Sequence, residues 1–276
     1  MRKRAVIDWS DWTQFKTFFL SLAWTQPRIL AMCIPIPIFN RSHLPGMLRM
    51  AVAAGMGLMV APTLMPAVAA AQWTPAQMGL LLVKEAFIGL VMGCLLAVPF
   101  WAFEALGFLM DNQRGATMGA TLDPLTGNDS SPLGSLFSQA FIVFFFVSGS
   151  FLLLLELLYG SFALWDVFRW TPHLRADAVP VLIAQFMRLL QLALLLAAPA
   201  IVVMLLAEIG LAVISRFVPQ LQVFFLAMPI KSALVLLVLA LYVGTLFDYA
   251  QAMLDGLREA PPLLDELWRP AAPQSR

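Results

Sequence analysis

The sequence predicts an all-α, multi-helix integral membrane protein. Three observations support this prediction: the composition, the mean hydropathy and the long apolar runs. Of the 276 residues, 61% are hydrophobic and 12% are charged, whereas about 25% of the residues in a soluble domain are charged. The mean hydropathy is +0.84. Prolines lie inside the apolar runs, so we expect proline-broken hydrophobic helices. The formal net charge of +1 argues against a nucleic-acid partner, which would need a basic face.

Six apolar segments make up one predicted membrane domain over residues 1–276. They cover residues 15–39, 46–71, 85–103, 133–165, 184–214 and 217–247, and a polar tail follows at residues 248–276. Because Pro37 disfavours helical geometry at the residue before it, we expect no straight helix beyond Ile34. No small-residue cleavage site ends the first segment, so we expect an uncleaved N-terminus.

The two middle segments are long enough to span a membrane. Between Glu85 and Glu104 lie 18 residues without a charge, about the minimum of 17 that a span needs. Gly89 and Gly93 lie four residues apart on one face of this helix, a spacing that lets another backbone approach closely. That backbone can belong to this chain or to another subunit. In the next segment, the 23 residues at positions 133–155 are uncharged.

A long polar stretch, residues 107–132, joins these two segments. It opens with Asp111, Gln113 and Arg114 and ends in turn-forming residues. A guanidinium makes several directed hydrogen bonds. We therefore expect Arg114 to be held by a carboxylate or by backbone carbonyl groups at the entrance of this loop.

The stretch between Arg216 and Lys231 is the most unusual in the chain. Its 14 intervening residues would form a helix of about 21 Å, too short for a hydrocarbon core of about 30 Å. A further apolar run follows, so Lys231 lies inside a long hydrophobic segment and needs a partner. Glu208 is the nearest carboxylate in similar surroundings, and we expect it to pair with Lys231. The polar residues and prolines of the stretch are Gln220, Gln222, Pro219 and Pro229.

These residues carry a resemblance to a known family. Arg-x-x-Pro-Gln-x-x-Val-Phe from Arg216, followed by Met-Pro-Ile-Lys ending at Lys231, is similar to a signature of the T subunit of type III secretion export apparatuses (SctT). The flagellar counterpart is FliR. The family usually has asparagine where this chain has Gln222. A second match runs from Glu104-Ala-x-Gly through Asp111-x-Gln-Arg-Gly to Asp123-Pro.

Another pattern separates the two branches of this family. Tyr159-x-Ser-Phe followed by Trp165 is similar to the injectisome subunits. Flagellar relatives usually show Asn-Gly-His earlier in this segment, where the present chain has Ser-Gly-Ser at residues 148–150. The injectisome branch is therefore favoured, and a flagellar export-gate subunit is the alternative.

The resemblance implies a subunit of the export gate in the bacterial inner membrane, with a cytoplasmic tail and multiple membrane passages. In this family the T subunit joins R and S subunits in a channel for unfolded effector and needle proteins, and a U subunit lies outside. The resemblance also implies that neighbouring subunits, as well as lipid, cover the apolar helices. It implies no cofactor.

Several charged residues border or interrupt the apolar runs. They either pair with one another and fix how helices pack, or line a hydrated conduit. Met228, beside Pro229, is likewise either a core residue or part of a deformable seal around a passing chain, since a thioether side chain adapts to irregular shapes. The charged residues are Glu85, Glu104, Glu156, Arg188, Glu208, Arg216 and Lys231.

Enzymatic function is not expected. The sequence has no nucleotide-binding glycine loop, no HExxH helix and no GxSxG elbow. Cys33 and Cys94 lie in apolar runs without a histidine cluster, which predicts free thiols rather than a zinc site. A small-molecule or ion transporter is the rival from another class, but it should repeat its broken segments in two halves. Residues 216–231 have no second copy.

Overall fold

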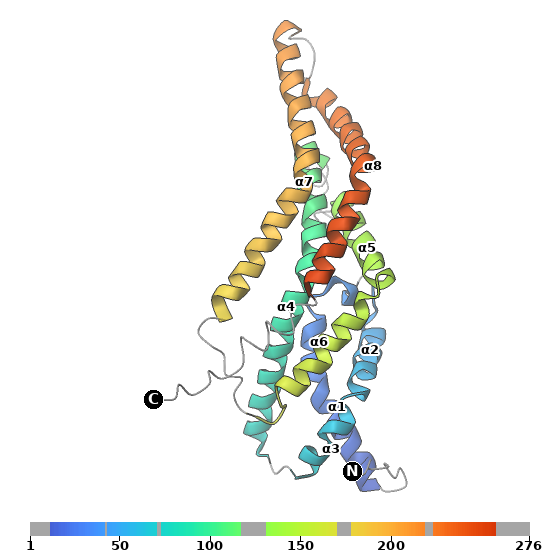
Figure 1. The fold of residues 1–276 in the computed structure, drawn as a ribbon, viewed down its shortest axis with the longest axis vertical. Helices are drawn as coiled ribbons and strands as arrows, with labels where there is room; N and C mark the ends of the chain where they lie inside the picture. Colours follow the sequence, from blue (N-terminus) through green and yellow to red (C-terminus); the bar gives the residue numbers. More distant parts are fainter. Residues whose placement is uncertain are drawn as a thin grey trace. The chain divides into compact units, whose positions relative to one another are not determined.

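A computed structural model describes residues 12–41, 43–70, 73–116, 131–169, 178–218 and 223–257 (Figure 1). Within these residues all regular structure is helical, which confirms the all-α prediction. The order is α1 (Trp12–Cys33), η1 (Pro37–Phe39), α2 (Gly46–Leu58), α3 (Ala61–Ala70), α4 (Pro75–Arg114), α5 (Pro132–Val147), α6 (Ser150–Leu164), α7 (Ala178–Phe217) and α8 (Val223–Leu257). The predicted uncleaved N-terminus, Pro219, Gln220 and residues 258–276 of the predicted tail lie outside the described residues.

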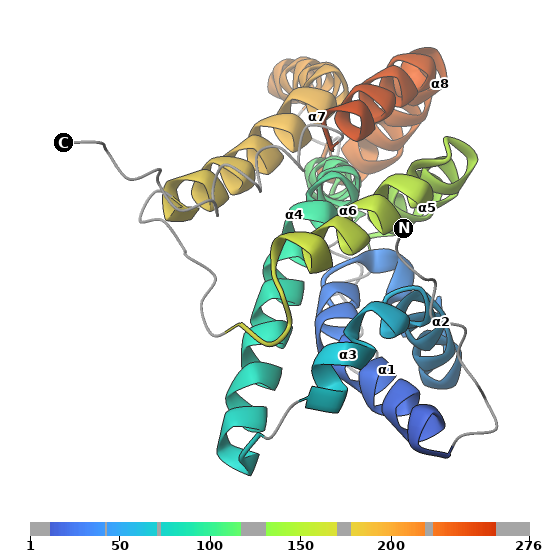
Figure 2. The ribbon, with the colours of Figure 1, turned by 60° about the horizontal axis from the view of Figure 1, so that its bottom comes forward.

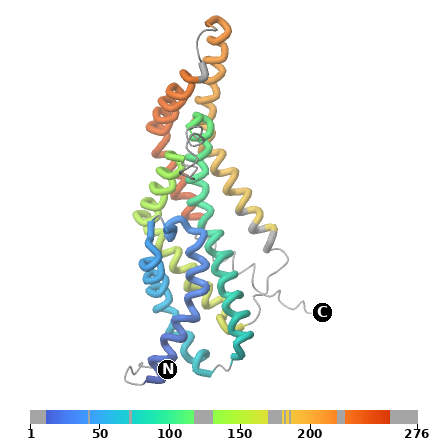
Figure 3. The backbone as a smooth tube through the Cα atoms, turned by 180° about the vertical axis from the view of Figure 1, so that it is seen from behind, coloured from blue at the N-terminus to red at the C-terminus, as the bar shows by residue number. Residues whose placement is uncertain are grey.

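The chain divides into two compact units. Unit 1 comprises residues 1–97, 151–178 and 259–276, and unit 2 comprises residues 98–150 and 179–258. Helix α4 therefore begins in unit 1 and ends in unit 2. Within unit 1, α1 packs against both α2 and α3 (Figure 2). Within unit 2, α7 and α8 lie side by side (Figures 1 and 3).

Two glycines allow α1 and the first part of α4 to touch within unit 1. A Cβ atom on Gly89 would overlap the carbonyl oxygen of Arg28, and one on Gly93 would overlap that of Met32. Any larger residue would force the two backbones apart. The backbone that approaches this pair of glycines therefore belongs to the chain itself.

Aromatic rings fill the contact between α4 and α5 in unit 2. The ring of Phe100 lies 4.8 Å from that of Phe141 and 5.1 Å from that of Phe145, measured between centroids. Phe103 lies 4.6 Å from Phe141. All four side chains are buried. This cluster fixes the part of α4 that leads to the polar residues at its end.

The prediction that prolines break the helices is wrong at several positions. Helices continue through Pro27, Pro66, Pro99, Pro199 and Pro229. A proline removes one backbone donor, and the packing of a long helix outweighs that single loss.

The helices break instead at two short turns. Residues 59–60 separate α2 from α3, which are bent by 76°. Residues 148–149 separate α5 from α6, and Gly149 there has a φ of +73°, a left-handed conformation that favours glycine. In α1 the prediction is correct, because the helix ends at Cys33, before Pro35 and Pro37.

Two helices extend well beyond the predicted segments. Helix α4 covers Pro75–Arg114 rather than residues 85–103, because lysine and glutamate are good helix formers and do not end a helix. Helix α8 continues to Leu257, so residues 248–257 of the predicted polar tail are helical.

The described residues contain three helices long and apolar enough to cross a membrane. These are α4, residues 186–217 of α7 and residues 225–256 of α8. The pairs α2 with α3 and α5 with α6 are long and apolar enough only when each bent pair is taken as one span, which gives up to five spans. In α8 only 11% of the 18-residue apolar stretch that qualifies the helix as a span is buried. Its surface is therefore available to lipid or to other proteins.

Candidate functional site

Five residues singled out from the sequence line one pocket in unit 2. The pocket has a volume of about 530 Å³ and is formed by the end of α4 together with α7 and α8. We call it the Lys231 pocket. The five residues are Gln113, Arg114, Glu208, Met228 and Lys231.

Lys231 joins the three helices around this pocket. Its Nζ atom lies 2.8 Å from Oε2 of Glu208 and donates a hydrogen bond of 3.2 Å to the backbone oxygen of Gln113. The predicted pairing of Glu208 with Lys231 is therefore confirmed. Lys231 is only 8% exposed, whereas the side chain of Glu208 is 51% exposed. The pair lies in an open pocket, where water weakens it.

Asp111 ties the end of α4 to the beginning of α5. Its Oδ1 atom lies 2.7 Å from both Nε and Nη2 of Arg114. Its Oδ2 atom accepts hydrogen bonds from the Ser131 hydroxyl at 2.7 Å and from the backbone N–H of Leu133 at 2.9 Å. Ser131 also caps α5 by accepting from the Gly134 N–H. The prediction that a carboxylate holds Arg114 is confirmed.

Gly115 places the end of α4 against Met228. Its φ of +82° is a conformation that favours glycine. A Cβ atom there would lie 3.5 Å from the Met228 Cε, in ordinary van der Waals contact. Met228 is half-buried and contributes a thioether to the wall of the Lys231 pocket.

Glu104 lies in a second pocket of unit 2, with a volume of about 430 Å³. We call it the Glu104 pocket. It is lined by Trp101, Glu104, Ala105 and Phe108 from α4 and by Ser131, Gly134 and Ser135 from the beginning of α5. Glu104 is exposed, and no cation contacts it within the described part of the chain.

The remaining candidates among the described residues do not line the Lys231 pocket. Glu85, Gly89 and Gly93 belong to unit 1. Arg216 is exposed near the end of α7, and Pro229 is exposed within α8. No group of three or more His, Cys, Asp or Glu side chains among the described residues could hold a metal ion. Cys33 and Cys94 are free thiols.

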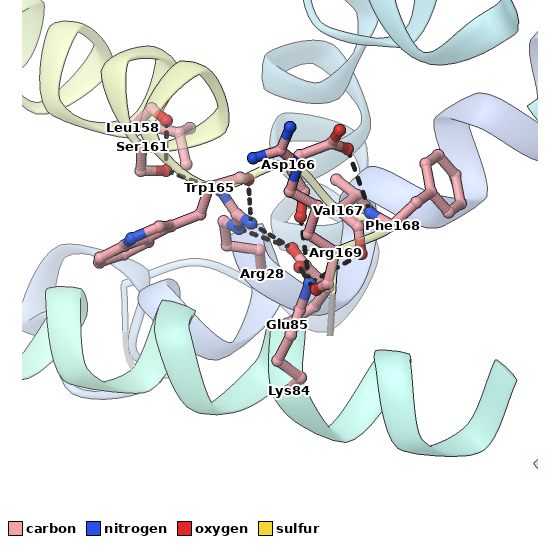
Figure 4. Close-up of polar contacts among 10 residues, drawn as sticks. All are labelled: Arg28, Lys84, Glu85, Leu158, Ser161, Trp165, Asp166, Val167, Phe168 and Arg169. Atoms are coloured by element: carbon pink, nitrogen blue, oxygen red, sulfur yellow. Dashed lines mark hydrogen bonds and ion pairs between the residues drawn. The ribbon is translucent and has the colours of Figure 1, made fainter. Parts of the chain in front are cut away.

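Sequence reasoning missed the charged cluster around Arg28 in unit 1. Arg28 and Glu85 are both fully buried (0% exposed). The guanidinium lies 2.6 Å from Glu85 Oε2, donates to the Ser161 hydroxyl at 3.2 Å and donates to the Trp165 carbonyl at 3.0 Å (Figure 4). Its Cζ atom lies 4.2 Å from the centroid of the Phe162 ring. Arg28 thus connects α1 with α4 and with the end of α6.

Lys84 completes this cluster. Its Nζ lies 2.8 Å from Oε1 of Glu85 and donates hydrogen bonds to the backbone oxygens of Asp166, Val167 and Arg169 (Figure 4). The chain that follows α6 is therefore anchored on the first half of α4. The sequence offered one signal, because Arg28 interrupts an apolar run directly after Pro27.

The chain is similar to known proteins along most of its length. Residues 19–257 match the family described as Bacterial export proteins, family 1. The chain is 40% identical over 232 residues to Yop proteins translocation protein T of Yersinia pestis, covering 83% of this chain and 88% of that protein. It is 40% identical over 159 residues to Secretion system apparatus protein SsaT of Salmonella typhimurium, covering 58% and 61%. Flagellar biosynthetic protein FliR of Bacillus subtilis is more distant, at 26% identity over 223 residues, covering 80% and 85%.

Proposed function

The chain belongs to the bacterial export proteins, family 1, as a type III secretion export-apparatus subunit of the injectisome branch, and on this premise we propose a role for its pocket. The protein acts in the bacterial inner membrane with the R, S and U subunits, in the gate through which unfolded effector and needle proteins pass. The Lys231 pocket forms part of the wall of that gate. We propose no catalytic role and no cofactor.

The observation that carries this proposal is a buried ammonium group held by three helices beside an open pocket. Lys231 lies in α8, which is apolar enough to cross a membrane, and a charge at the centre of a bilayer costs about 2.5–3.5 kcal/mol on insertion scales. Glu208 and the Gln113 carbonyl offset that cost. Because the Glu208 side chain is half-exposed, the pocket must face water or another protein rather than hydrocarbon.

The surface of α7 supports covering by other subunits. Only 33% of its apolar window is buried, and Arg188, Glu208 and Arg216 are exposed along the same helix. Hydrocarbon would tolerate the apolar side chains but not these three charges. Protein partners supply both apolar contact and polar groups, so we propose that partner subunits cover this helix and that lipid covers only part of the chain.

The transporter alternative rests on the same buried charge, since transporters also place charged groups near the membrane midplane. The family membership and the absence of a second copy of residues 216–231 favour the export gate. The flagellar alternative is less favoured because the flagellar relative is the more distant one.

A double-mutant cycle tests the role of the pocket. Glu208→Gln or Lys231→Met alone should destabilise the assembled complex by about 1–3 kcal/mol, between the values for exposed and buried pairs. The double variant should recover most of the complex yield, because the uncompensated charge disappears, yet should still export substrate poorly. Complex yield and export are measured together for all four proteins.

Lys16→Met is the matched control for this cycle, because it removes an exposed cation of α1, in unit 1, that does not line the pocket. This control variant should leave both the complex yield and the export of substrate near the wild-type level. Strict additivity of the two single losses would reject the ion pair. Recovery of export as well as yield in the double variant would make the pair a structural contact and would contradict the gate role.

A further inference from the structure

Glu104 is a carboxylate without a cation on a largely apolar helix. It lies in α4, one of the helices long and apolar enough to cross a membrane. Its side chain is exposed, and within the described residues no basic side chain lines its pocket. An ionised carboxylate facing hydrocarbon is costly. A polar or charged group must therefore meet Glu104 in the assembled protein.

The lining of the Glu104 pocket suits a basic side chain. Trp101 and Phe108 lie three residues before and four residues after Glu104, on the same face of α4. Apart from Glu104, the other lining residues are the small residues Ala105, Ser131, Gly134 and Ser135. Aromatic faces attract cations, and a carboxylate pairs with a guanidinium through two parallel hydrogen bonds.

The wall of this pocket that comes from α5 is held rigidly. A Cβ atom on Gly107 would overlap the backbone at Leu133, and one on Gly134 would lie 3.3 Å from the backbone oxygen of Glu104. The two helices therefore touch. Asp111 fixes the first turn of α5 through its hydrogen bonds to Ser131 and Leu133. A preformed pocket loses little conformational entropy when it is filled.

The nearby parts of the chain do not supply the cation. Residues 115–130, which join α4 to α5, contain no lysine, arginine or histidine. Arg114 is engaged by Asp111, and Lys231 is engaged by Glu208. The other described basic residues of unit 2, Arg188 and Arg216, do not line this pocket. A second protein chain is therefore the source that fits the charge of the pocket.

We propose that the Glu104 pocket receives an arginine side chain from a neighbouring subunit of the export apparatus. The carboxylate of Glu104 neutralises the guanidinium, and Trp101 and Phe108 lie beside its planar group. This inference rests on the proposed function, because it requires the chain to assemble with other subunits.

Photocrosslinking in the complete apparatus identifies the occupant. The photoreactive residue p-benzoylphenylalanine replaces Phe108, and the crosslinked peptide is mapped by mass spectrometry. We expect a crosslink to an apolar segment of another apparatus subunit, close to an arginine. A crosslink only to lipid, or only to the basic residues at either end of this chain, would overturn the proposal.

Charge reversal then tests the contact. Glu104→Arg should reduce the amount of co-purified partner subunit by about tenfold or more, because it places two like charges against each other at the contact. Changing the mapped arginine to glutamate should restore co-purification, which a misfolded variant would not allow. Glu156→Arg is the matched control, because Glu156 is an exposed carboxylate on the apolar helix α6 that does not line this pocket.

The outcomes separate this inference from the function on which it rests. If the wild-type chain fails to co-purify with apparatus subunits, the proposed function is overturned together with the inference. If the wild-type chain co-purifies and Glu104→Arg behaves like Glu156→Arg, the inference alone is overturned.

Discussion

Replacing Glu85 by alanine should destabilise the chain more than any exposed substitution, by about 3–5 kcal/mol, because it leaves a buried guanidinium without its carboxylate. Arg28 and Glu85 are both fully buried and lie 2.6 Å apart. Thermal denaturation of the detergent-solubilised complex measures the loss. The amount of chain that accumulates in membranes should fall in parallel.

The double variant Arg28→Met with Glu85→Met should recover most of this loss, since both buried charges are removed. Recovery will be incomplete, because the Trp165 carbonyl loses the hydrogen bond from Arg28. Glu156→Gln is the control on an exposed carboxylate, and its effect should stay within about 0.5 kcal/mol. If the double variant lost as much as the sum of the two single variants, Arg28 and Glu85 would not act as a pair.

Replacing Asp111 by alanine should have the second-largest effect. The change removes the acceptor for Arg114, for the Ser131 hydroxyl and for the Leu133 N–H. We expect a loss of about 3 kcal/mol or more, because a charged, fully buried group with several donors is lost. Complex recovery and substrate export should both fall.

The effect of Asp111→Ala can be compared with the effects of two arginine variants. Arg114→Ala should cost about 1–3 kcal/mol, less than Asp111→Ala, because Asp111 keeps its hydrogen bonds to Ser131 and Leu133. Arg169→Ala, at an exposed side chain in the other polar loop, should cost within about 0.5 kcal/mol. Equal tolerance of the changes at Arg114 and Arg169 would contradict the role of the Asp111–Arg114 contact in holding the entrance of this loop.

The contacts of Lys231 and Arg114 could be predicted from the sequence because their surroundings restrict the choice of partner. A lysine inside an apolar run requires a carboxylate in similar surroundings, and Glu208 lies 23 residues away at the end of the preceding segment. Arg114 lies three residues from Asp111, within reach along one helix. In both cases local sequence and charge were sufficient.

The cluster around Arg28 could not be predicted in the same way. Its hydrogen-bond partners Glu85 and Ser161 lie 57 and 133 residues away. Choosing them requires knowing which helices pack together, and the close approach at Gly89 that brings α1 and α4 into contact was compatible with two different partners. The Tyr-x-Ser-Phe pattern contained Ser161, but nothing in the sequence linked that hydroxyl to α1.

Helix boundaries were the weakest part of the prediction. Proline positions do not predict the helix ends, because the loss of one hydrogen bond does not end a helix as long as α7 or α8. The turn at residues 148–149 was missed although it contains Gly149. Glycine inside an apolar run is equally compatible with close helix packing and with a turn, and only the structure distinguishes the two.

The most direct test of this account is purification of the chain with and without the R and S subunits of the export apparatus. The large apolar surfaces of α7 and α8, with charges exposed along α7, predict that the chain alone is unstable in detergent. With its partners it should form a mixed complex that resists heating and migrates as one species in size-exclusion chromatography. A monodisperse, thermally robust monomer that does not bind these subunits would contradict the account.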